Sequence, residues 1–330
     1  MRPPDDFSAR IHGGPDALGV PLHDFSTNGN ACGPCPGAQV AMAQADASRY
    51  PDASYAALRQ SLAEFHGVDP ARLVLAGSAS EFIFRFTAWA ARAGARRVAV
   101  PVLAYGDYAQ AAAAHGLQVV RTAGAADLHW ACDPGSPLGA AQQGLAALVE
   151  AAAPGSVVLD RAYEPLRLSG DLALDVEALA RVWQLWTPNK ALGLTGVRAA
   201  YAIAPVAAGD AVRALDALCP SWPLGVHGVA LLEAWCTRAV QQWLAGSRQT
   251  LRSWKSRQLA VCEALGWHGL ASDANFFCAR PGEGLSLQAL RSRGIKLRDT
   301  HSFGLANHVR LSVQPPGAQD ALAAAVRALA

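Results

Sequence analysis

Between residues 186 and 198 the chain reads Trp186-Thr187-Pro188-Asn189-Lys190-Ala191-Leu192-Gly193-Leu194-Thr195-Gly196-Val197-Arg198. Proline and glycine punctuate this stretch, so its lysine does not belong to a charged helix face. Only three of the 28 basic residues are lysines, namely Lys190, Lys255 and Lys296. Arginine can replace lysine in most ion pairs, but only lysine forms a Schiff base with an aldehyde. We therefore expect Lys190 to be present for its amine, and Lys255 and Lys296, which lie among arginines, to be solvated surface residues.

The composition is that of a compact globular chain, with 52% hydrophobic and 16% charged residues. A length of 330 residues suits one large domain and one smaller domain. The net charge of +2 gives no reason to expect a nucleic acid or a membrane as partner. No apolar run approaches the roughly 18 residues that span a bilayer, and Met1 to Arg10 lacks a signal-peptide core. We therefore expect a cytoplasmic protein.

The seven cysteines are an odd number in a long chain, which favours reduced thiols over a disulfide framework. Cys32-Gly33-Pro34-Cys35 has the CxxC form of redox and zinc sites. No second pair and no strand-to-helix setting accompany it, so a structural turn is the favoured interpretation. We therefore expect no metal site.

The order of apolar and helical patterns predicts an α/β fold. Residues 1–39 are rich in Gly, Pro and Asn and are expected to form an N-terminal arm that belongs to the small domain and covers the active site. Helical patterns and short apolar runs alternate over 40–225, which predicts a large domain with a doubly wound, mostly parallel sheet. Residues 226–262 have the pattern of one long helix, which leads into a small α+β domain within 226–330. The expected strands of the large domain are 73–76, 98–100, 119–120, 128–130, 157–159 and 199–202.

A lysine that binds an aldehyde cofactor such as pyridoxal phosphate needs partners for the rest of that molecule. The ring nitrogen needs a carboxylate that keeps it protonated, the phosphate needs N–H groups at a helix N-terminus, and the ring needs an aromatic face. Asp160 ends the apolar run 157–159, and Tyr163 follows three residues later. A carboxylate at the carboxyl end of a parallel strand lies where open α/β sheets bind ligands, although a helix cap or a loop residue would have the same sequence.

Two further segments follow predicted strands. Gly77-Ser78-Ala79-Ser80-Glu81 opens a helix and suits an anion, although an ordinary N-cap with an acidic first turn looks the same. Tyr105, in Tyr105-Gly106-Asp107-Tyr108, is placed to stack on a ring or simply to pack. Thr187 and Arg198 flank Lys190 and are both able to reach one phosphate.

Together these segments resemble the fold-type I pyridoxal-phosphate enzymes of the class I/II aminotransferase group, over nearly the whole chain. Thr187, Lys190 and Arg198 match the hydroxyl–x–x–lysine motif and the arginine that follows it in that family. Asp160 and Tyr163 match its Asp-x-x-Tyr motif. The resemblance implies that Lys190 holds the cofactor, that Asp160 holds the pyridine nitrogen and that Tyr163 approaches the ring hydroxyl.

The resemblance also implies ligands for the cofactor phosphate and ring. Ser78, Ala79 and Ser80 match the phosphate loop, and Tyr105 matches the stacking aromatic. Tyr50, in Tyr50-Pro51-Asp52, looks like the tyrosine that reaches the cofactor phosphate of the neighbouring subunit. This implies a homodimer with shared active sites.

One segment departs from the family pattern. The family usually carries Asn-Pro-x-Asn-Pro-x-Gly, whose second asparagine bonds to the ring hydroxyl, but here the segment is Asp133-Pro134-Gly135-Ser136-Pro137-Leu138-Gly139. Ser136 is shorter, and we expect it to reach the ring only through water. Arg310, in His308-Val309-Arg310-Leu311-Ser312-Val313, looks like the small-domain arginine that binds a substrate carboxylate.

Two segments narrow the resemblance. Ile11-His12-Gly13-Gly14, followed by His23-Asp24-Phe25-Ser26-Thr27-Asn28, is similar to the N-terminus of L-threonine-O-3-phosphate decarboxylases of cobalamin biosynthesis, and 297–305 leading into Arg310 is similar to their C-terminal part. We therefore expect decarboxylation of L-threonine O-3-phosphate to (R)-1-aminopropan-2-ol O-phosphate and carbon dioxide, with His12 and Arg298 on the substrate phosphate. Histidinol-phosphate aminotransferases share much of the pattern, including the arginine at 298, so transamination of histidinol phosphate or a similar phosphorylated amine is the alternative. A non-catalytic ligand-binding relative is a lesser alternative that only Ser136 favours.

Overall fold

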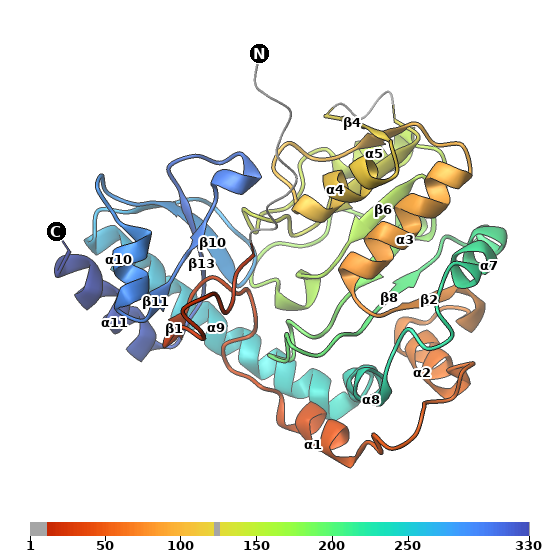
Figure 1. Cartoon of the computed structure of the whole chain (residues 1–330), viewed down its shortest axis with the longest axis horizontal. Coiled ribbons are helices and arrows are strands. Elements are labelled where there is room, and N and C mark those ends of the chain that lie inside the picture. The colour runs from red at the N-terminus through yellow and green to blue at the C-terminus, as the bar shows by residue number, and fades with distance from the viewer. Residues whose placement is uncertain (1–11, 122–125, 330) are drawn as a thin grey trace.

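The computed structural model describes residues 12–121 and 126–329, so Ile11 and the polar start of the chain lie outside the described residues. Figure 1 shows a large sheet on the right, a smaller sheet on the left, and helix α9 (Arg238–Ala264) running between them. The large sheet has the strand order β2-β8-β7-β6-β5-β3-β4. Its strands are β2 (Leu73–Ala76), β3 (Arg97–Ala99), β4 (Gln118–Val120), β5 (Leu128–Cys132), β6 (Val157–Asp160), β7 (Trp183–Trp186) and β8 (Ala200–Ile203).

Strands β3 to β7 of the large sheet run parallel, which is the predicted α/β arrangement. Strand β8 was expected to be parallel, and this expectation was wrong, because β8 pairs antiparallel with both β7 and β2. The connection from β7 to β8 contains no crossover helix, which a parallel pair would need. Strand β7 itself was not predicted, because Gln184 interrupts its apolar run; this side chain is buried and accepts a hydrogen bond from Arg161 Nη1 at 2.9 Å.

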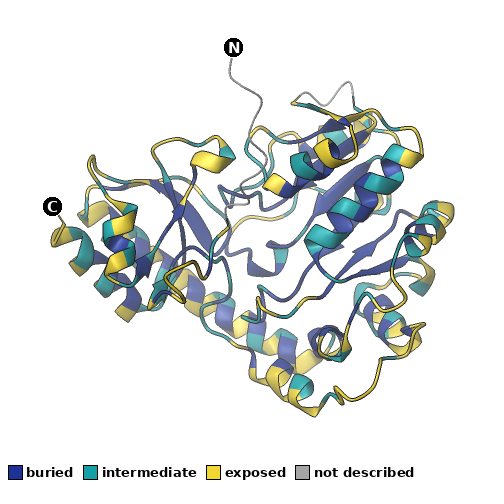
Figure 2. Ribbon diagram, viewed as in Figure 1, coloured by how far each residue is buried: buried dark blue, intermediate teal, exposed yellow. Residues whose placement is uncertain are grey.

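Helices cover both faces of the large sheet, so its central strands are buried on both sides, whereas the edge strand β4 is partly exposed. In β2, Leu73 and Leu75 enter one core cluster, and Val74 and Ala76 enter the other, as the two-residue period of a strand requires. Figure 2 shows these strands as a dark band between helices whose outer faces are exposed. The helices around this sheet are α2 (Ala56–His66), η1 (Pro70–Arg72), α3 (Ala79–Arg92), α4 (Gly106–Ala114), α5 (Leu145–Ala151), η3 (Glu164–Leu166), α6 (Val176–Ala180) and α7 (Gly209–Ala217).

The smaller sheet has the strand order β12-β13-β10-β9. Its strands are β9 (His268–Gly269), β10 (Phe276–Arg280), β12 (Arg298–Asp299) and β13 (Val309–Ser312), and the helices near it are α10 (Leu287–Ser292), η4 (His301–Phe303) and α11 (Pro316–Arg327). One helix was expected over 226–262, and this was wrong. The chain forms α8 (Val226–Trp235) and α9 as two separate helices. They are separate because the backbone of Thr237 is extended, and its hydroxyl caps α9 by accepting the Val240 N–H at 3.4 Å.

The N-terminal arm is attached to the small sheet. It contains β1 (His23–Asp24) and runs into α1 (Pro36–Gln44), which begins at the end of the arm and continues into the large domain. Strand β1 pairs with β11 (Ile295–Lys296) in a two-stranded parallel sheet, and Phe25 O accepts the Ser312 N–H at 2.8 Å. On this pairing we propose the division into an arm (1–39), a large domain (40–225) and a bridging helix with a small domain (226–330).

Lys255 and Lys296 are not the solvated residues that were expected. Lys255 is 9% exposed, and its Nζ donates to Ser272 O at 2.5 Å and Ala274 O at 2.8 Å. Burial lowers the pKa of Lys255 to about 8. Lys296 is half-buried, and its Nζ donates to Gly14 O at 2.5 Å. Their arginine neighbours gave a misleading signal, because a lysine that donates to backbone carbonyls can be buried among charged residues.

Segment 272–274, whose carbonyl groups accept hydrogen bonds from Lys255, is also bonded to loops of the large domain. The N–H groups of Asp273 and Ala274 donate to Gly139 O at 2.7 and 3.0 Å, and Asp273 O accepts the Leu168 N–H at 2.6 Å. The segment 272–274 therefore bonds to both parts of the molecule at the start of β10.

All seven cysteines are free thiols. Cys35 is buried and precedes α1 as its N-cap residue, and Cys32 Sγ lies 3.7 Å from Ser247 O, which fits a structural turn. Among the described helices, none combines the length and the hydropathy that crossing a bilayer requires.

Candidate active site

Lys190 lies in the turn after β7, at the carboxyl end of the parallel strands. It is half-buried, and its Nζ lies 5.4 Å from the centroid of the Tyr163 ring. The turn is fixed from within, because Thr187 Oγ1 donates to Asn189 Oδ1 at 2.9 Å and lies 3.3 Å from Ala199 O. Thr187 is buried, so its hydroxyl holds the loop that presents the amine.

Asp160 ends strand β6, next to the strand that leads to Lys190. Its carboxylate is buried and accepts two hydrogen bonds, from the Ala162 N–H at 2.9 Å and from the Tyr108 hydroxyl at 2.7 Å. Burial raises the pKa of Asp160, while the bond from Tyr108, the bond from Ala162 and the charge of Lys190 oppose that rise. The amine and the carboxylate that the sequence picked out therefore influence each other electrostatically.

Tyr108 is a site residue that the sequence analysis missed. It is fully buried and stacks on Trp130, with ring centroids 4.9 Å apart and an interplanar angle of 8°. Burial raises the pKa of Tyr108 well above its ordinary value, so the hydroxyl remains a donor to Asp160. The available signal was the second tyrosine of Tyr105-Gly106-Asp107-Tyr108, which lies one helical turn after the first.

The N-terminus of α3 shows the cap that the sequence left open as an alternative. Ser78 Oγ accepts the Glu81 N–H at 3.0 Å, as in a capping box, and Glu81 Oε2 accepts the N–H of Gly77, one residue before the N-cap, at 3.2 Å. The N–H groups of Ala79 and Ser80 belong to the first turn, where a helix has no acceptor of its own and favours an anion. The backbone here suits a phosphate, whereas the Ser78 hydroxyl is already engaged.

Tyr105 joins this helix end to the rest of the site. Its hydroxyl lies 3.1 Å from Ser80 Oγ, and its ring centroid lies 5.8 Å from that of Tyr108. His12, which is exposed, has its ring centroid 6.3 Å from that of Tyr105. Burial raises the pKa of Tyr105, and the charge of Asp107 adds to that rise.

Arg310 brings the small sheet to the site. It lies on β13, is 7% exposed, and its Nη1 donates to Ser136 Oγ at 3.3 Å while its Nη2 donates to Ser26 O at 3.1 Å. Its Nε is buried with no hydrogen-bond partner among the described residues. Burial lowers the pKa of Arg310. Its guanidinium lies 5.6 Å from the ring of Phe276, which contacts Tyr163 edge-on with centroids 4.7 Å apart.

Arg298 lies beside Arg310, because the two residues are paired across strands β12 and β13. The ring of Phe303 lies 4.7 Å from the Arg298 guanidinium and 5.4 Å from that of Arg310. Burial lowers the pKa of Arg298 to about 10, and the charge of Arg310 contributes. Two guanidiniums on one face of the small sheet create a strongly positive patch that suits an anionic ligand.

The loop that carries Ser136 is held by a buried ion pair. Asp133, which stands where the family usually has its first asparagine, pairs with Arg167 Nη2. Arg167 also pairs with Glu164 at 2.8 Å, just beyond Tyr163. The loop is thereby tied to the segment that follows Asp160.

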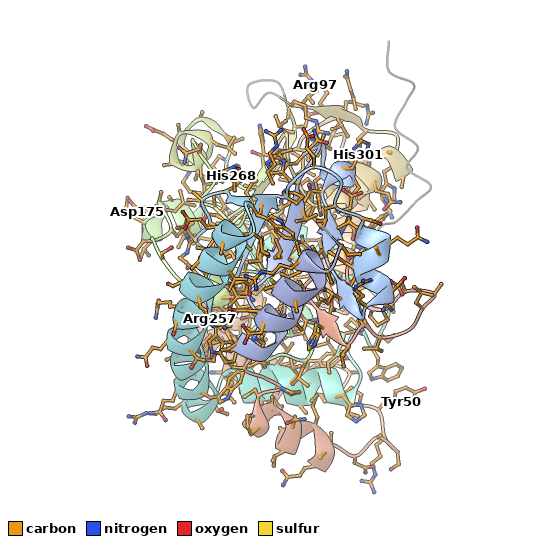
Figure 3. All side chains as sticks on the ribbon, turned by 90° about the vertical axis from the view of Figure 1, so that its left-hand side faces the viewer. Tyr50, Arg97, Asp175, Arg257, His268 and His301 are labelled. Atoms are coloured by element: carbon orange, nitrogen blue, oxygen red, sulfur yellow. The ribbon has the colours of Figure 1, made fainter. Side chains whose placement is uncertain are left out.

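Two predicted residues lie apart from this cluster within the described chain. Tyr50 is 76% exposed and stacks on Trp222 with centroids 4.5 Å apart, and Figure 3 shows it at the lower edge of the molecule. It lines a groove of about 440 Å³ between α1 and α8. Arg198 is exposed and lines a neighbouring groove of about 560 Å³ with Met42 and His227.

The chain is similar to aminotransferases over most of its length. The family model described as aminotransferase class I and II matches residues 23–329. A histidinol-phosphate aminotransferase of Symbiobacterium thermophilum is 29% identical over 325 residues, which cover 89% of this chain and 88% of the relative. The crystal structure of histidinol-phosphate aminotransferase from Sinorhizobium meliloti in complex with pyridoxal 5′-phosphate has a TM-score of 0.76 and 22% identity, and the match covers 92% of this chain and 90% of that one.

The crystal structure of L-threonine-O-3-phosphate decarboxylase from Porphyromonas gingivalis is similar as well. It has a TM-score of 0.73 and 19% identity, and the match covers 88% of this chain and 94% of that one. At these identities the two solved structures show that the fold is shared, which confirms the predicted fold class, and do not decide between their reactions.

The described residues fit a pyridine aldehyde phosphate. Asp160 offers a buried carboxylate, Lys190 an amine beside it, and α3 an anion-binding N-terminus. The buried Arg310 Nε and Asn28 Oδ1 have no partner among the described residues, as expected for atoms that face a ligand.

Proposed function

Because the chain belongs to the class I and II aminotransferase family, we propose that it is an aminotransferase that acts on a phosphorylated amine of the histidinol-phosphate kind. Its cofactor is pyridoxal 5′-phosphate. The sequence favoured decarboxylation of threonine phosphate and held transamination as its alternative. The names of the relatives support the alternative better, so we place transamination first.

We propose the following positions for the cofactor. Lys190 carries its aldehyde carbon, Asp160 faces its ring nitrogen, Tyr105 lies on its ring, and Tyr163 faces its ring hydroxyl, with Ser136 farther away. Its phosphate is bound at 78–80. For Thr187 and Arg198 to contribute from the loop after β7, the Thr187 hydroxyl would have to leave Asn189 Oδ1, and Arg198 would have to turn inward from its exposed groove. The distances around Lys190, Tyr163, Asp160 and Ser80 support this arrangement.

The chain's own groups would divide the work of transamination. When bound, pyridoxal phosphate accepts the electron pair released at the substrate α-carbon. The Asp160 carboxylate keeps a proton on the ring nitrogen, and the Tyr108 hydroxyl keeps that carboxylate charged. Lys190 Nζ moves the proton to and from the α-carbon. Tyr163 holds the ring hydroxyl in place.

The observation that carries the proposal is the pair of arginines on the small sheet. Transamination requires one site to accept two substrates in turn, a phosphorylated amine and a 2-oxo acid. The guanidiniums of Arg298 and Arg310 both lie over the ring of Phe303, at 4.7 and 5.4 Å from its centroid. A guanidinium is a planar donor that suits either a phosphate or a carboxylate. We therefore propose that Arg310 binds a carboxylate or phosphate and that Arg298 and His12 bind the substrate phosphate.

We also propose that two chains share their active sites. Tyr50 is exposed beside the groove between α1 and α8, and Arg198 is exposed beside the adjoining groove. A second copy of the chain seated on these grooves would bring its Tyr50 to the cofactor phosphate. The seven free thiols support a reducing, cytoplasmic setting for this dimer.

The test is a direct comparison of two reactions by the same cofactor-loaded enzyme. With histidinol phosphate and 2-oxoglutarate, we expect glutamate to form and no carbon dioxide. With L-threonine O-3-phosphate alone, we expect little carbon dioxide release. Rapid release of carbon dioxide that needs no 2-oxo acid would overturn the proposal in favour of decarboxylation.

Decarboxylation of threonine phosphate is the second candidate, because that substrate carries both a carboxylate and a phosphate for the two arginines. The position of His12, whose ring centroid lies 6.3 Å from that of Tyr105, favours it. A non-catalytic ligand-binding relative is the third reading. Turnover with either substrate would eliminate it.

A further inference from the structure

Asn28 lies in the N-terminal arm, far from the cofactor motifs in sequence, yet it contacts one of their residues. Its Nδ2 donates to the Tyr163 hydroxyl at 3.2 Å. The side chain is 3% exposed, and its Oδ1 is buried with no partner among the described residues. A buried amide oxygen without a partner is costly, and a bound ligand that carries a donor would remove that cost.

The position of Asn28 is fixed by the backbone around it. Asn275 Nδ2 donates to Gly29 O at 2.9 Å, and the Asn30 N–H donates to Lys190 O at 2.8 Å. The arm is therefore anchored on one side to the segment that enters β10 and on the other to the lysine turn. Asn28 lies between these two anchors.

The contact with Asn28 determines whether the Tyr163 hydroxyl acts as a donor or an acceptor toward a further partner. A phenol has one proton to donate and can accept hydrogen bonds at its oxygen. The Asn28 amide has no way to accept through Nδ2, so it donates, and Tyr163 keeps its own proton for another acceptor. A hydroxyl that accepts one hydrogen bond becomes a stronger donor in the next one.

We infer that Asn28 is a positioning residue that acts through Tyr163 on the ring oxygen of the cofactor. This chain carries Ser136 where its relatives usually carry an asparagine for that oxygen, and Ser136 Oγ accepts a bond from Arg310. Asn28 of the arm supplies an amide in place of the one that is absent at 136, but it acts through the Tyr163 hydroxyl rather than on the ring oxygen directly. The inference rests on the proposed role of Tyr163 at the ring hydroxyl.

The chemical consequence is a change in proton affinity. A donor to the ring oxygen withdraws negative charge from it, and this lowers the affinity of the cofactor–lysine linkage for its proton. Asn28 therefore makes that linkage easier to deprotonate. The linkage has to be unprotonated before it can accept the proton of a substrate amine.

The experiment is a pH titration of the visible absorption band of the enzyme loaded with pyridoxal phosphate. Asn28→Ala and the similarly sized, uncharged Asn28→Leu each remove the amide donor. We expect both to raise the pH midpoint of the band by about 0.5 unit or more, since a hydrogen bond of ordinary strength corresponds to a shift of that order. The matched control is Gln319→Ala, which removes another fully buried amide donor, on α11, whose Nε2 donates to Trp254 O at 3.0 Å and to Gln314 O at 2.6 Å, and we expect its midpoint to be that of the wild type.

A second step separates action through Tyr163 from a general effect on the arm. In a Tyr163→Phe background, Asn28→Ala should add no further shift. An unchanged midpoint in both single variants, or an equal shift with and without the Tyr163 hydroxyl, overturns the inference. If the loaded wild-type enzyme lacks a titrating band that depends on Lys190, the cofactor arrangement itself has failed, which is a different result.

Discussion

Replacing Tyr108 by phenylalanine removes the hydroxyl that donates a hydrogen bond to Asp160 and changes little else. The ring keeps its stacking on Trp130, because that contact involves only the aromatic faces. What is lost is a hydrogen bond of 2.7 Å to a buried carboxylate. Asp160 would then keep only the Ala162 N–H among its described hydrogen-bond donors.

The size of the effect follows from the type of bond. A hydrogen bond to a charged group contributes about 1.5–3 kcal/mol. Burial already raises the pKa of Asp160, and the bond from Tyr108 is the largest factor that opposes this rise. Without it the carboxylate would take up a proton more easily and hold the ring nitrogen less well. We therefore expect kcat for transamination to fall about 10- to 100-fold, with weaker binding of pyridoxal phosphate.

The control is Tyr201→Phe, which removes a hydroxyl from another fully buried tyrosine. That hydroxyl accepts a bond from Trp235 Nε1 at 3.1 Å and lies 2.7 Å from His66 Nε2, on the other face of the large sheet. Both variants are compared by thermal melting, cofactor titration and kcat. Tyr201→Phe should lower the melting temperature while kcat stays within about twofold of the wild type. If Tyr108→Phe behaves like Tyr201→Phe in all three measurements, the reasoning about Asp160 is wrong.

Three further predictions concern the lysine, the substrate and the folded state. Lys190→Ala should abolish the visible absorption band of the loaded enzyme, and a variant with a normal spectrum and full turnover would contradict the role of Lys190. Arg310→Lys keeps the charge but loses the planar fork, so KM for the anionic substrates should rise about 10- to 100-fold, whereas Arg280→Lys, at the exposed end of β10, should leave it unchanged. Burial, aided by Arg161, lowers the pKa of His66 from 6.5 to about 4, so between these values the unfolded chain binds a proton that the folded chain does not. The free energy of unfolding in urea should therefore fall by about 3 kcal/mol from pH 7.5 to pH 4 through this residue, and a His66→Gln variant that shows the same pH dependence as the wild type would refute this.

Much of the site could be predicted because its chemistry follows parallel strands. Asp160 ends a buried strand that the apolar run 157–159 predicts, and ligands bind at the carboxyl ends of such strands. Lys190 was found in another way, from the scarcity of lysine and from the proline- and glycine-punctuated segment around it, because strand β7 was not predicted. The contacts of Asn28 and Tyr108 could not be found in either way. Asn28 and Tyr163 are 135 residues apart, and nothing local in either segment indicates that tertiary packing brings an amide to a hydroxyl.

The errors in the fold have a similar origin. The alternation of helix and strand patterns was sufficient for the α/β class, but the direction of β8 depends on the length and form of its connection to β7. The break between α8 and α9 depends on the side chain of Thr237, which has no proline or glycine beside it to mark a helix end. Lys255 is buried because two backbone carbonyls face it, a fact that its charged neighbours in the sequence conceal.

The segment 272–274 has a mechanical consequence. It is bonded on one side to Gly139 and Leu168 and on the other to Lys255, at the point where the chain enters β10. Any displacement of the small sheet against the large one would therefore strain these bonds, as well as those that Arg310 makes to Ser136 Oγ and Ser26 O. Since Arg298 and Arg310 lie on strands of the small sheet, their positions relative to Lys190 depend on these bonds.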